Sequence, residues 1–95
     1  MILQEKVLII IPAYNEASTI TQLIKSLKSF NDQWDIIIVN DGSSDETGTL
    51  AEETGLVSVV NLPYNLGIGA AVQTGFKYAF EKKYDYALQF DGDGQ

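Results

Sequence analysis

The five-residue run VLIII, Val7–Ile11, followed by Pro12, decides the fold class of this protein. Consecutive apolar residues without polar alternation are typical of a strand that is buried on both faces of a sheet. Further apolar runs occupy Ile36–Val39, Leu56–Val60 and Tyr86–Phe90. A sheet buried on both faces needs a layer of helices on each side, so the sequence predicts an α/β fold with a parallel sheet.

The segments between these strands show helical spacing of apolar residues. We predict a helix from Ser18 to Phe30, with Ser18 or Thr19 as its N-cap, and a third helix over Leu66–Lys82. A second helix is expected over Ser43–Thr54, capped by Ser44. Alternating strands and helices favour a doubly wound, Rossmann-like parallel sheet with four strands in the order 3-2-1-4 and three helices.

Composition limits the chemistry of the chain. Its 95 residues are 45% hydrophobic and 20% charged, which is typical of one small globular domain. The absence of cysteine and histidine excludes disulfides, thiolate nucleophiles, Ser-His-Asp triads and imidazole metal ligands. Thirteen acids against six lysines give a net charge of −7, so we expect no nucleic-acid partner. The cysteine-free composition predicts a cytoplasmic protein, or one at the cytoplasmic face of a membrane.

Four polar, glycine-containing segments follow the four predicted strands. They are PAYNE (12–16), NDGSSD (40–45), NLPYNLGIG (61–69) and DGDGQ (91–95). Each segment alone is also compatible with an ordinary turn, because Gly, Asn, Asp and Pro dominate turns. In a parallel sheet, however, all four would lie at the carboxyl edge, where open α/β sheets bind ligands. We therefore expect a ligand site at this edge.

The segment DGDGQ carries the strongest signal for a metal. Asp91 and Asp93 would place two carboxylates side by side, which is unfavourable unless a cation lies between them. Oxygen ligands without His or Cys favour Mg²⁺ or Mn²⁺ over zinc. Asp91 and Asp93 are therefore the predicted metal ligands, with Gln95 as a third oxygen ligand.

The first two loops offer groups that suit a nucleoside. We expect Asp41 to accept a hydrogen bond from a base N–H or a ribose hydroxyl, with Ser44 and Asp45 as capping residues. Tyr14 would stack on a base and Glu16 would accept hydroxyl groups. Equally open is the alternative that Tyr14 is a half-buried loop aromatic and Glu16 an acid at a helix start.

The third loop resembles a G-x-G-x-x-G dinucleotide motif only in part, because Val72 replaces the third glycine and the loop does not follow the first strand. NAD binding is therefore not expected. Gly67 and Gly69 would instead let a helix start lie close to a ligand. The apolar residues predicted to form the core of this helix are Ala71, Phe76, Ala79 and Phe80.

The four motifs IIPAYNE, IIVNDGSSDET, NLPYNLGIGAAVQTGFKYA and QFDGDGQ, in this order, resemble family 2 glycosyltransferases of the GT-A fold, most closely the polyprenol-phosphate sugar synthase-like branch. The resemblance implies an enzyme that transfers a sugar with inversion from a nucleotide-diphosphate-sugar to a lipid-phosphate or saccharide acceptor, using Mg²⁺ or Mn²⁺. It implies nucleotide contacts at Pro12, Ala13, Tyr14, Glu16, Asp41, Gly69, Asp91 and Gly92. It also implies metal ligation by Asp91, Asp93 and Gln95. Asn40 departs from the Asp found in many members.

The resemblance further implies that residues 1–95 form the N-terminal, nucleotide-sugar-binding part of a GT-A domain. The acceptor-binding half, with its general base and any membrane association, is not among these residues, so we expect this chain alone to be inactive in transfer. Without a further strand, Tyr86–Phe90 would be an apolar sheet edge, which predicts a homodimer or other self-association. A non-catalytic module that binds nucleotide-sugar or metal is the alternative function. A phospho-acceptor receiver domain is disfavoured, because Asn61 stands where its acceptor Asp is needed.

Overall fold

A computed structural model describes residues 4–91. Its elements are β1 (Val7–Ala13), α1 (Ile20–Phe30), β2 (Asp35–Asn40), α2 (Thr47–Glu53), β3 (Ser58–Asn61), α3 (Ile68–Glu81) and β4 (Tyr86–Gln89). The strands form one parallel sheet in the order β3-β2-β1-β4, which confirms the predicted α/β class and strand order. Ile9 of β1 lies beside Ile36 of β2 on one side and Leu88 of β4 on the other.

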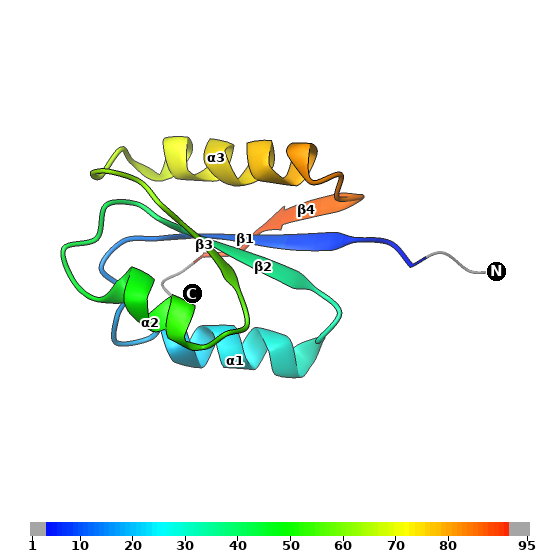
Figure 1. The fold of residues 1–95 in the computed structure, drawn as a ribbon, viewed down its shortest axis with the longest axis horizontal. Helices are drawn as coiled ribbons and strands as arrows, with labels where there is room; N and C mark the ends of the chain where they lie inside the picture. The colour runs from blue at the N-terminus through cyan, green and yellow to red at the C-terminus, as the bar shows by residue number, and fades with distance from the viewer. Residues whose placement is uncertain (1–3, 92–95) are drawn as a thin grey trace.

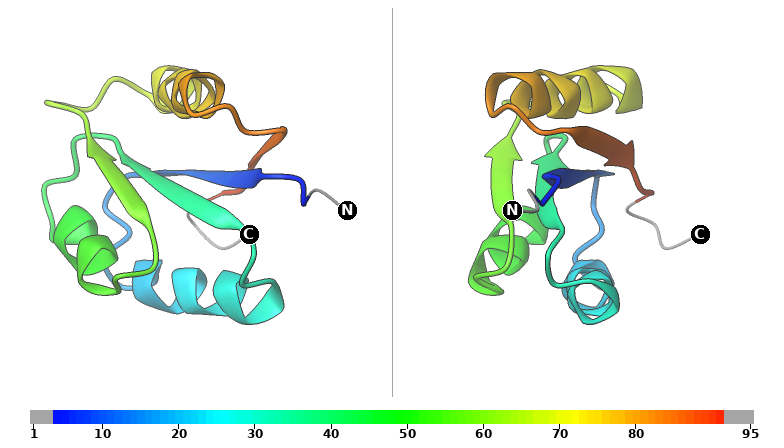
Figure 2. Two further views of the ribbon diagram at one scale, coloured as in Figure 1. Left: turned by 45° about the vertical axis from the view of Figure 1, so that its right-hand side comes forward. Right: turned by 90° about the vertical axis from the view of Figure 1, so that its right-hand side faces the viewer.

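Helices cover both faces of the sheet (Figures 1 and 2). Helices α1 and α2 pack on one face, where Ile9 and Ile11 of β1 meet Ile20 and Ile24 of α1. Helix α3 packs on the other face against a second apolar cluster that contains Ile10. Successive side chains of a strand point to opposite faces, so the run Val7–Ile11 supplies both clusters. This arrangement confirms the prediction that the first strand is buried on both faces.

Helix α1 begins directly after Thr19, one of its two predicted N-caps, whereas helix α2 begins later than predicted. Helix α1 begins at Ile20, and Thr19 holds the N-cap position without a side-chain capping bond. Helix α2 begins at Thr47 rather than Ser43, so the prediction that Ser44 caps it is wrong. Both the N–H and the hydroxyl of Ser44 donate instead to Asn15 Oδ1. The segment 43–46 is therefore held by the neighbouring loop and does not join the helix.

Helix α3 contacts the sheet through small residues. Ala71, Gly75 and Ala79 are spaced four apart and are buried against it. The prediction that Phe76 and Phe80 belong to the core is wrong, because they are 44% and 83% exposed. Each follows a buried residue by one position and is therefore turned by about 100° around the helix axis.

Helix α3 has 14 residues, and no helix within residues 4–91 is long and apolar enough to cross a membrane.

Gly75 provides a test of this packing. A Cβ atom added there would overlap Cγ2 of Ile10 in β1. We expect Gly75→Ala to lower the free energy of unfolding by about 1 to 2 kcal/mol, because overpacking outweighs the better helix propensity of alanine. Urea unfolding measures the change. Gly69→Ala is the matched control, since a Cβ there meets nothing within 4 Å, and it should leave stability equal or higher. Equal stabilisation by both variants would contradict the packing.

Candidate functional site

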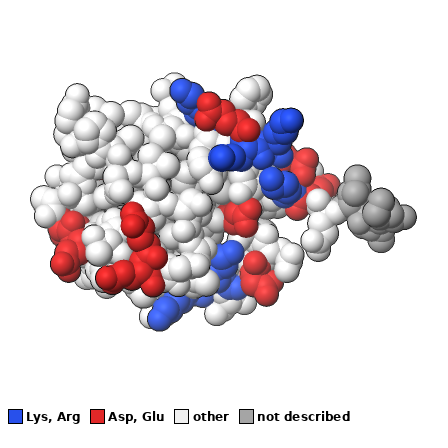
Figure 3. All heavy atoms as spheres, viewed as in Figure 1, with Lys and Arg blue, Asp and Glu red and all other residues white. Residues whose placement is uncertain are grey.

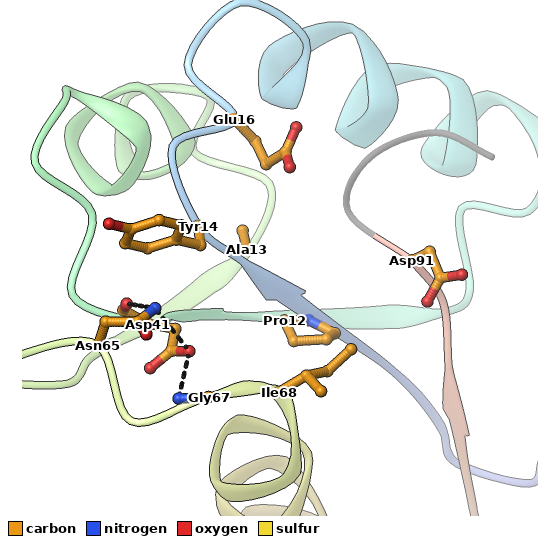
Figure 4. A pocket seen from close by; sticks show the side chains of 9 residues that line it. All are labelled: Pro12, Ala13, Tyr14, Glu16, Asp41, Asn65, Gly67, Ile68 and Asp91. Carbon is orange, nitrogen blue, oxygen red and sulfur yellow. Dashed lines mark hydrogen bonds between the residues drawn. The ribbon is translucent and has the colours of Figure 1, made fainter.

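A pocket of ≈ 350 Å³ opens at the carboxyl ends of the strands (Figure 4). It lies between the ends of β1 and β4, where the strand order reverses. The helices α1 and α2, which follow β1 and β2, cover one face of the sheet, and α3, which leads into β4, covers the other. Open sheets bind ligands at such a switch point. The loops after β1, β2 and β3 and the end of β4 all contribute to it, as the sequence predicts. Its lining residues are Pro12, Ala13, Tyr14, Glu16, Asp41, Asn65, Gly67, Ile68 and Asp91.

Pro12 helps to open this pocket. Strand β1 continues through Pro12 to Ala13 on the side of β2, where Ala13 accepts a hydrogen bond from the N–H of Asp41. On the side of β4 the pairing ends at Ile10, whose carbonyl accepts from the N–H of Phe90. Backbone groups alternate sides along a strand, so Pro12 faces β4 and has no N–H to donate. The two strands therefore part at this residue.

Tyr14 and Glu16 follow β1 and both line the pocket. The Tyr14 side chain is 46% exposed, so one part of the ring remains open for stacking. The carbonyl of Glu16 accepts hydrogen bonds from Thr19 and Ile20 at the start of α1. Glu16 is thus both a helix-start residue and a pocket residue, and the two alternatives drawn from the sequence are compatible.

Asp41 is the most enclosed carboxylate of the pocket, at 4% exposure. One oxygen accepts the Leu66 N–H at 2.8 Å, and the other accepts the Gly67 N–H at 3.0 Å and the Asn65 amide at 3.2 Å (Figure 4). These donors all belong to the loop between β3 and α3. Asp41 therefore holds this loop against the pocket, a role that the sequence does not reveal.

The loop after β3 contributes residues that sequence reasoning missed. These residues are Asn65 and Ile68, which line the pocket. Gly67, which the sequence does indicate, lines it as well, with a φ of +99° at the N-cap of α3. Gly69 is the second residue of the helix and is not a lining residue, so its nucleotide contact stays a prediction. The signal available for Asn65 was its place in an Asn-Leu-Gly turn after a strand, which by itself does not indicate a side chain that reaches the preceding loop.

The loops after β1 and β2 are joined by side chains. The N–H groups of Asn15, Glu16 and Ala17 donate to side-chain oxygens of Ser43, Thr47 and Asp45, at 2.9, 2.9 and 3.2 Å. In return, Asn15 Oδ1 accepts the N–H of Ser44 at 2.9 Å and that of Asp45 at 3.4 Å. We call this set of contacts the loop clasp. The capping role predicted for Asp45 is realised in part, because its carboxylate accepts the Thr47 N–H at 3.0 Å.

The hydrogen bonds that Asp45 accepts lower its pKa. The hydrogen bond from the Thr47 hydroxyl is the largest cause, and desolvation opposes it. Because the pKa is lower in the folded state than in the unfolded chain, the contribution of Asp45 to stability is present above the unfolded pKa of about 4 and is lost as pH falls through the folded pKa. Asp45 is therefore charged at neutral pH.

Asp91 lies at the end of β4 and is exposed on the pocket rim. The other residues of the predicted metal and diphosphate site, Gly92, Asp93 and Gln95, lie outside the described residues. Within residues 4–91, no three side chains of His, Cys, Asp or Glu are grouped closely enough to hold a metal ion. The donors present are nevertheless carboxylate oxygens, which suit a hard cation such as Mg²⁺ or Mn²⁺.

Charge around the pocket is negative. Three carboxylates, Glu16, Asp41 and Asp91, line it, and no lining residue in the described part of the chain is basic. In the view of Figure 3, acidic side chains gather over α2 at the end with the strand-end loops, whereas lysines and acids are mixed toward the other end of the molecule. An anionic ligand would therefore need a cation to enter this pocket with it.

The fold and the pocket define an open α/β protein with a pocket at its switch point. The sequence matches the family described as Glycosyl transferase family 2 over residues 8–95, and the chain belongs to this family. Its parallel sheet and three helices are those of a GT-A fold, which confirms the resemblance seen in the sequence.

The names of two similar curated proteins contain polyprenol or dolichyl phosphate. The chain is 34% identical to polyprenol monophosphomannose synthase of Mycolicibacterium smegmatis over 95 residues, covering 95% of this chain and 36% of that protein. It is 36% identical to UDP-N-acetylglucosamine--dolichyl-phosphate N-acetylglucosaminyltransferase of Methanococcus voltae, covering 92% of this chain and 41% of that protein. The chain thus spans well under half the length of these relatives.

Solved structures share the fold. A mannosyltransferase from Pyrobaculum calidifontis, solved with GDP-Man and Mn²⁺, superposes with a TM-score of 0.82 at 21% identity, covering 96% of this chain and 28% of that one. Glucosyl-3-phosphoglycerate synthase from Mycobacterium tuberculosis, solved with Mn²⁺, UDP and glucosyl-3-phosphoglycerate, superposes with a TM-score of 0.73 at 25% identity. That superposition covers 93% of this chain and 33% of the synthase.

The hydrogen bonds to Asp41 lead to a prediction about the loop. Asp41→Asn should lower the free energy of unfolding by about 1 to 3 kcal/mol, because its amide would face the donors Gly67 N–H and Asn65 Nδ2. Urea unfolding and amide exchange of Leu66 and Gly67 measure the effect. Asp91→Asn makes the same chemical change at an exposed site and should leave both unchanged. Unaltered exchange at Leu66 and Gly67 in Asp41→Asn would contradict this role.

Proposed function

We propose that this chain forms the donor site of an inverting glycosyltransferase and binds a nucleotide-diphosphate-sugar together with Mg²⁺ or Mn²⁺. The observation that supports it is the pocket at the switch point, which carries three carboxylates and no basic side chain among its described lining residues. A diphosphate bound there needs a cation between itself and the protein. Membership of glycosyl transferase family 2 supports the sugar-transfer chemistry.

The nucleoside would occupy the part of the pocket formed by the first three loops. Tyr14 offers a ring face to the base, and Glu16 offers oxygens to hydroxyl groups. The two oxygens of Asp41 accept three hydrogen bonds from the protein, and a carboxylate has about four lone-pair sites. The remaining site is available for a base N–H or a ribose hydroxyl.

The cation would be held by Asp91, Asp93 and Gln95. When bound there, it would neutralise the diphosphate and stabilise it as the leaving group. The complex of glucosyl-3-phosphoglycerate synthase with Mn²⁺ and UDP supports this assignment at 25% identity. The choice between Mg²⁺ and Mn²⁺ is open, because both accept an all-oxygen ligand set.

The acceptor we propose is a polyprenyl phosphate, with a saccharide as the alternative. The names of the relatives supply the support, since they include polyprenol, undecaprenyl and dolichyl phosphates. Lipid-linked substrates and a cysteine-free chain support action in the cytoplasm or at the cytoplasmic face of a membrane. Inversion requires a general base opposite the leaving diphosphate, and we assign no residue of this chain to that role.

Nucleotide binding should depend on the cation. We expect UDP or GDP to bind the 95-residue chain at least about tenfold more tightly with Mn²⁺ than without it, because the carboxylates otherwise repel the diphosphate. Isothermal titration calorimetry measures both affinities. Asp93→Ala should abolish the metal dependence, while Asp32→Ala, which removes an acid before β2, should not. Equal affinities with and without Mn²⁺ would refute the proposed site.

We also propose that the chain self-associates as a two-fold dimer through β4. This strand ends the sheet, and its exposed residues Tyr86 and Leu88, followed by Phe90, are apolar. Beside it, an apolar cavity of ≈ 560 Å³ lies between β4 and α1. Strand β4 contains no charged residue and no proline, so neither charge repulsion nor a missing N–H opposes antiparallel pairing with a second copy.

Light scattering over a concentration series tests this dimer. We expect the apparent mass to rise toward twice that of the monomer at high micromolar concentration, because pairing buries the apolar edge. Leu88→Lys should keep the chain monomeric, since it places a charge in the pairing surface. Leu56→Lys changes an exposed leucine away from β4 and should dimerise like the wild type. A wild type that stays monomeric throughout would show that the edge does not pair.

A further inference from the structure

The loop clasp lies directly behind the pocket. Tyr14 and Glu16 line the pocket, while the residue between them, Asn15, turns its side chain toward the segment 43–45. We propose that Asn15, with Asp45 and Thr47, is a positioning device that holds Tyr14 and Glu16 where they meet the nucleoside. This inference rests on the proposed nucleotide site and adds residues that touch no ligand.

The contacts of the clasp act on the backbone of the pocket loop. Three consecutive N–H groups, from Asn15 to Ala17, each donate to a different side chain of the segment 43–47. Thr47 is fully buried, and its hydroxyl accepts the Glu16 N–H while it donates to Asp45. A loop with three consecutive N–H groups bound to the neighbouring segment cannot shift without breaking several hydrogen bonds at once.

Asn15 meets two requirements that few residues combine. Its φ of +53° lies in the left-handed region, which Asn and Asp tolerate better than other side chains. Its Oδ1 atom accepts the N–H groups of Ser44 and Asp45 and the hydroxyl of Ser44. Glycine would satisfy only the backbone requirement, whereas aspartate would satisfy both.

This pair of substitutions separates backbone conformation from the side-chain contact. Asn15→Gly keeps the left-handed backbone and removes the acceptor, so we expect Mn²⁺-dependent UDP or GDP binding to weaken about tenfold. Asn15→Asp keeps an acceptor of the same shape, so its affinity for UDP or GDP with Mn²⁺ should lie within about threefold of that of the wild type. Calorimetry measures both. Equal affinity in Asn15→Gly and the wild type would overturn the proposal.

A second comparison distinguishes positioning from a general loss of stability. Gly75→Ala, whose overlap with Ile10 lies about two helical turns from the pocket residue Ile68, serves as a destabilised control and should bind UDP or GDP normally at a temperature where it is folded. In a chain that already carries Tyr14→Ala and Glu16→Ala, adding Asn15→Gly should lower the affinity for UDP or GDP by less than about twofold. The reason is that the side chains that Asn15 positions are then absent. A full tenfold loss in that background would show that Asn15 acts by another route.

The two proposals fail differently. If the wild type binds neither UDP nor GDP with Mn²⁺, the proposed function is wrong. NMR of the ligand-free chain then tests separately whether Asn15 positions Tyr14 and Glu16. Asn15→Gly should speed amide exchange at Ser44 and Asp45 and shift the signals of Tyr14 and Glu16. Unchanged Tyr14 and Glu16 signals would overturn the positioning role.

Discussion

The burial of β1 on both faces is the constraint on which the rest of this structure depends. Ile9 and Ile11 require the layer of α1 and α2, and Ile10 requires α3. A strand so enclosed must also pair its backbone groups on both sides, and β2 and β4 provide this pairing. Where Pro12 has no N–H to offer, β4 separates from β1 and the pocket begins. One strand thus sets the layers, the strand order and the place of the site.

The walls of the pocket are held by polar side chains that bind neighbouring loops. Asp41 holds the loop after β3, and the clasp centred on Asn15 holds the loop after β1. Such short loops contain little apolar material, so hydrogen bonds between them replace the packing that fixes the strands. The carboxylates that line the pocket make it negative, and this charge is why the proposed function pairs an anionic donor with a cation.

Sequence reasoning located the strands and most of the site, and it failed where contacts between distant segments compete with local preference. The four strands were located because each run is mostly apolar, although β3 begins at Ser58 rather than at Leu56. Ser44 has the residue type of a helix cap, but Asn15, 29 residues away, binds both its N–H and its hydroxyl. Phe80 has the spacing of a core residue, yet it is exposed, and the small residues of α3 pack against the sheet instead. Asn65 was missed because its role depends on Asp41.

The sequence by itself determined the α/β class, the order of the strands and the gathering of four polar loops at one sheet edge, because apolar runs and turn residues act through local periodicity and strand direction. It also determined the family, because four motifs stand in order along the chain. Only the tertiary structure decided which polar side chains face the pocket and which tie its loops together. Asn and Asp occur in both groups, so residue type does not distinguish them. The hydrogen bonds that tie the loops together join residues 24 to 31 positions apart. Such pairings arise only once the sheet has brought the strand ends side by side.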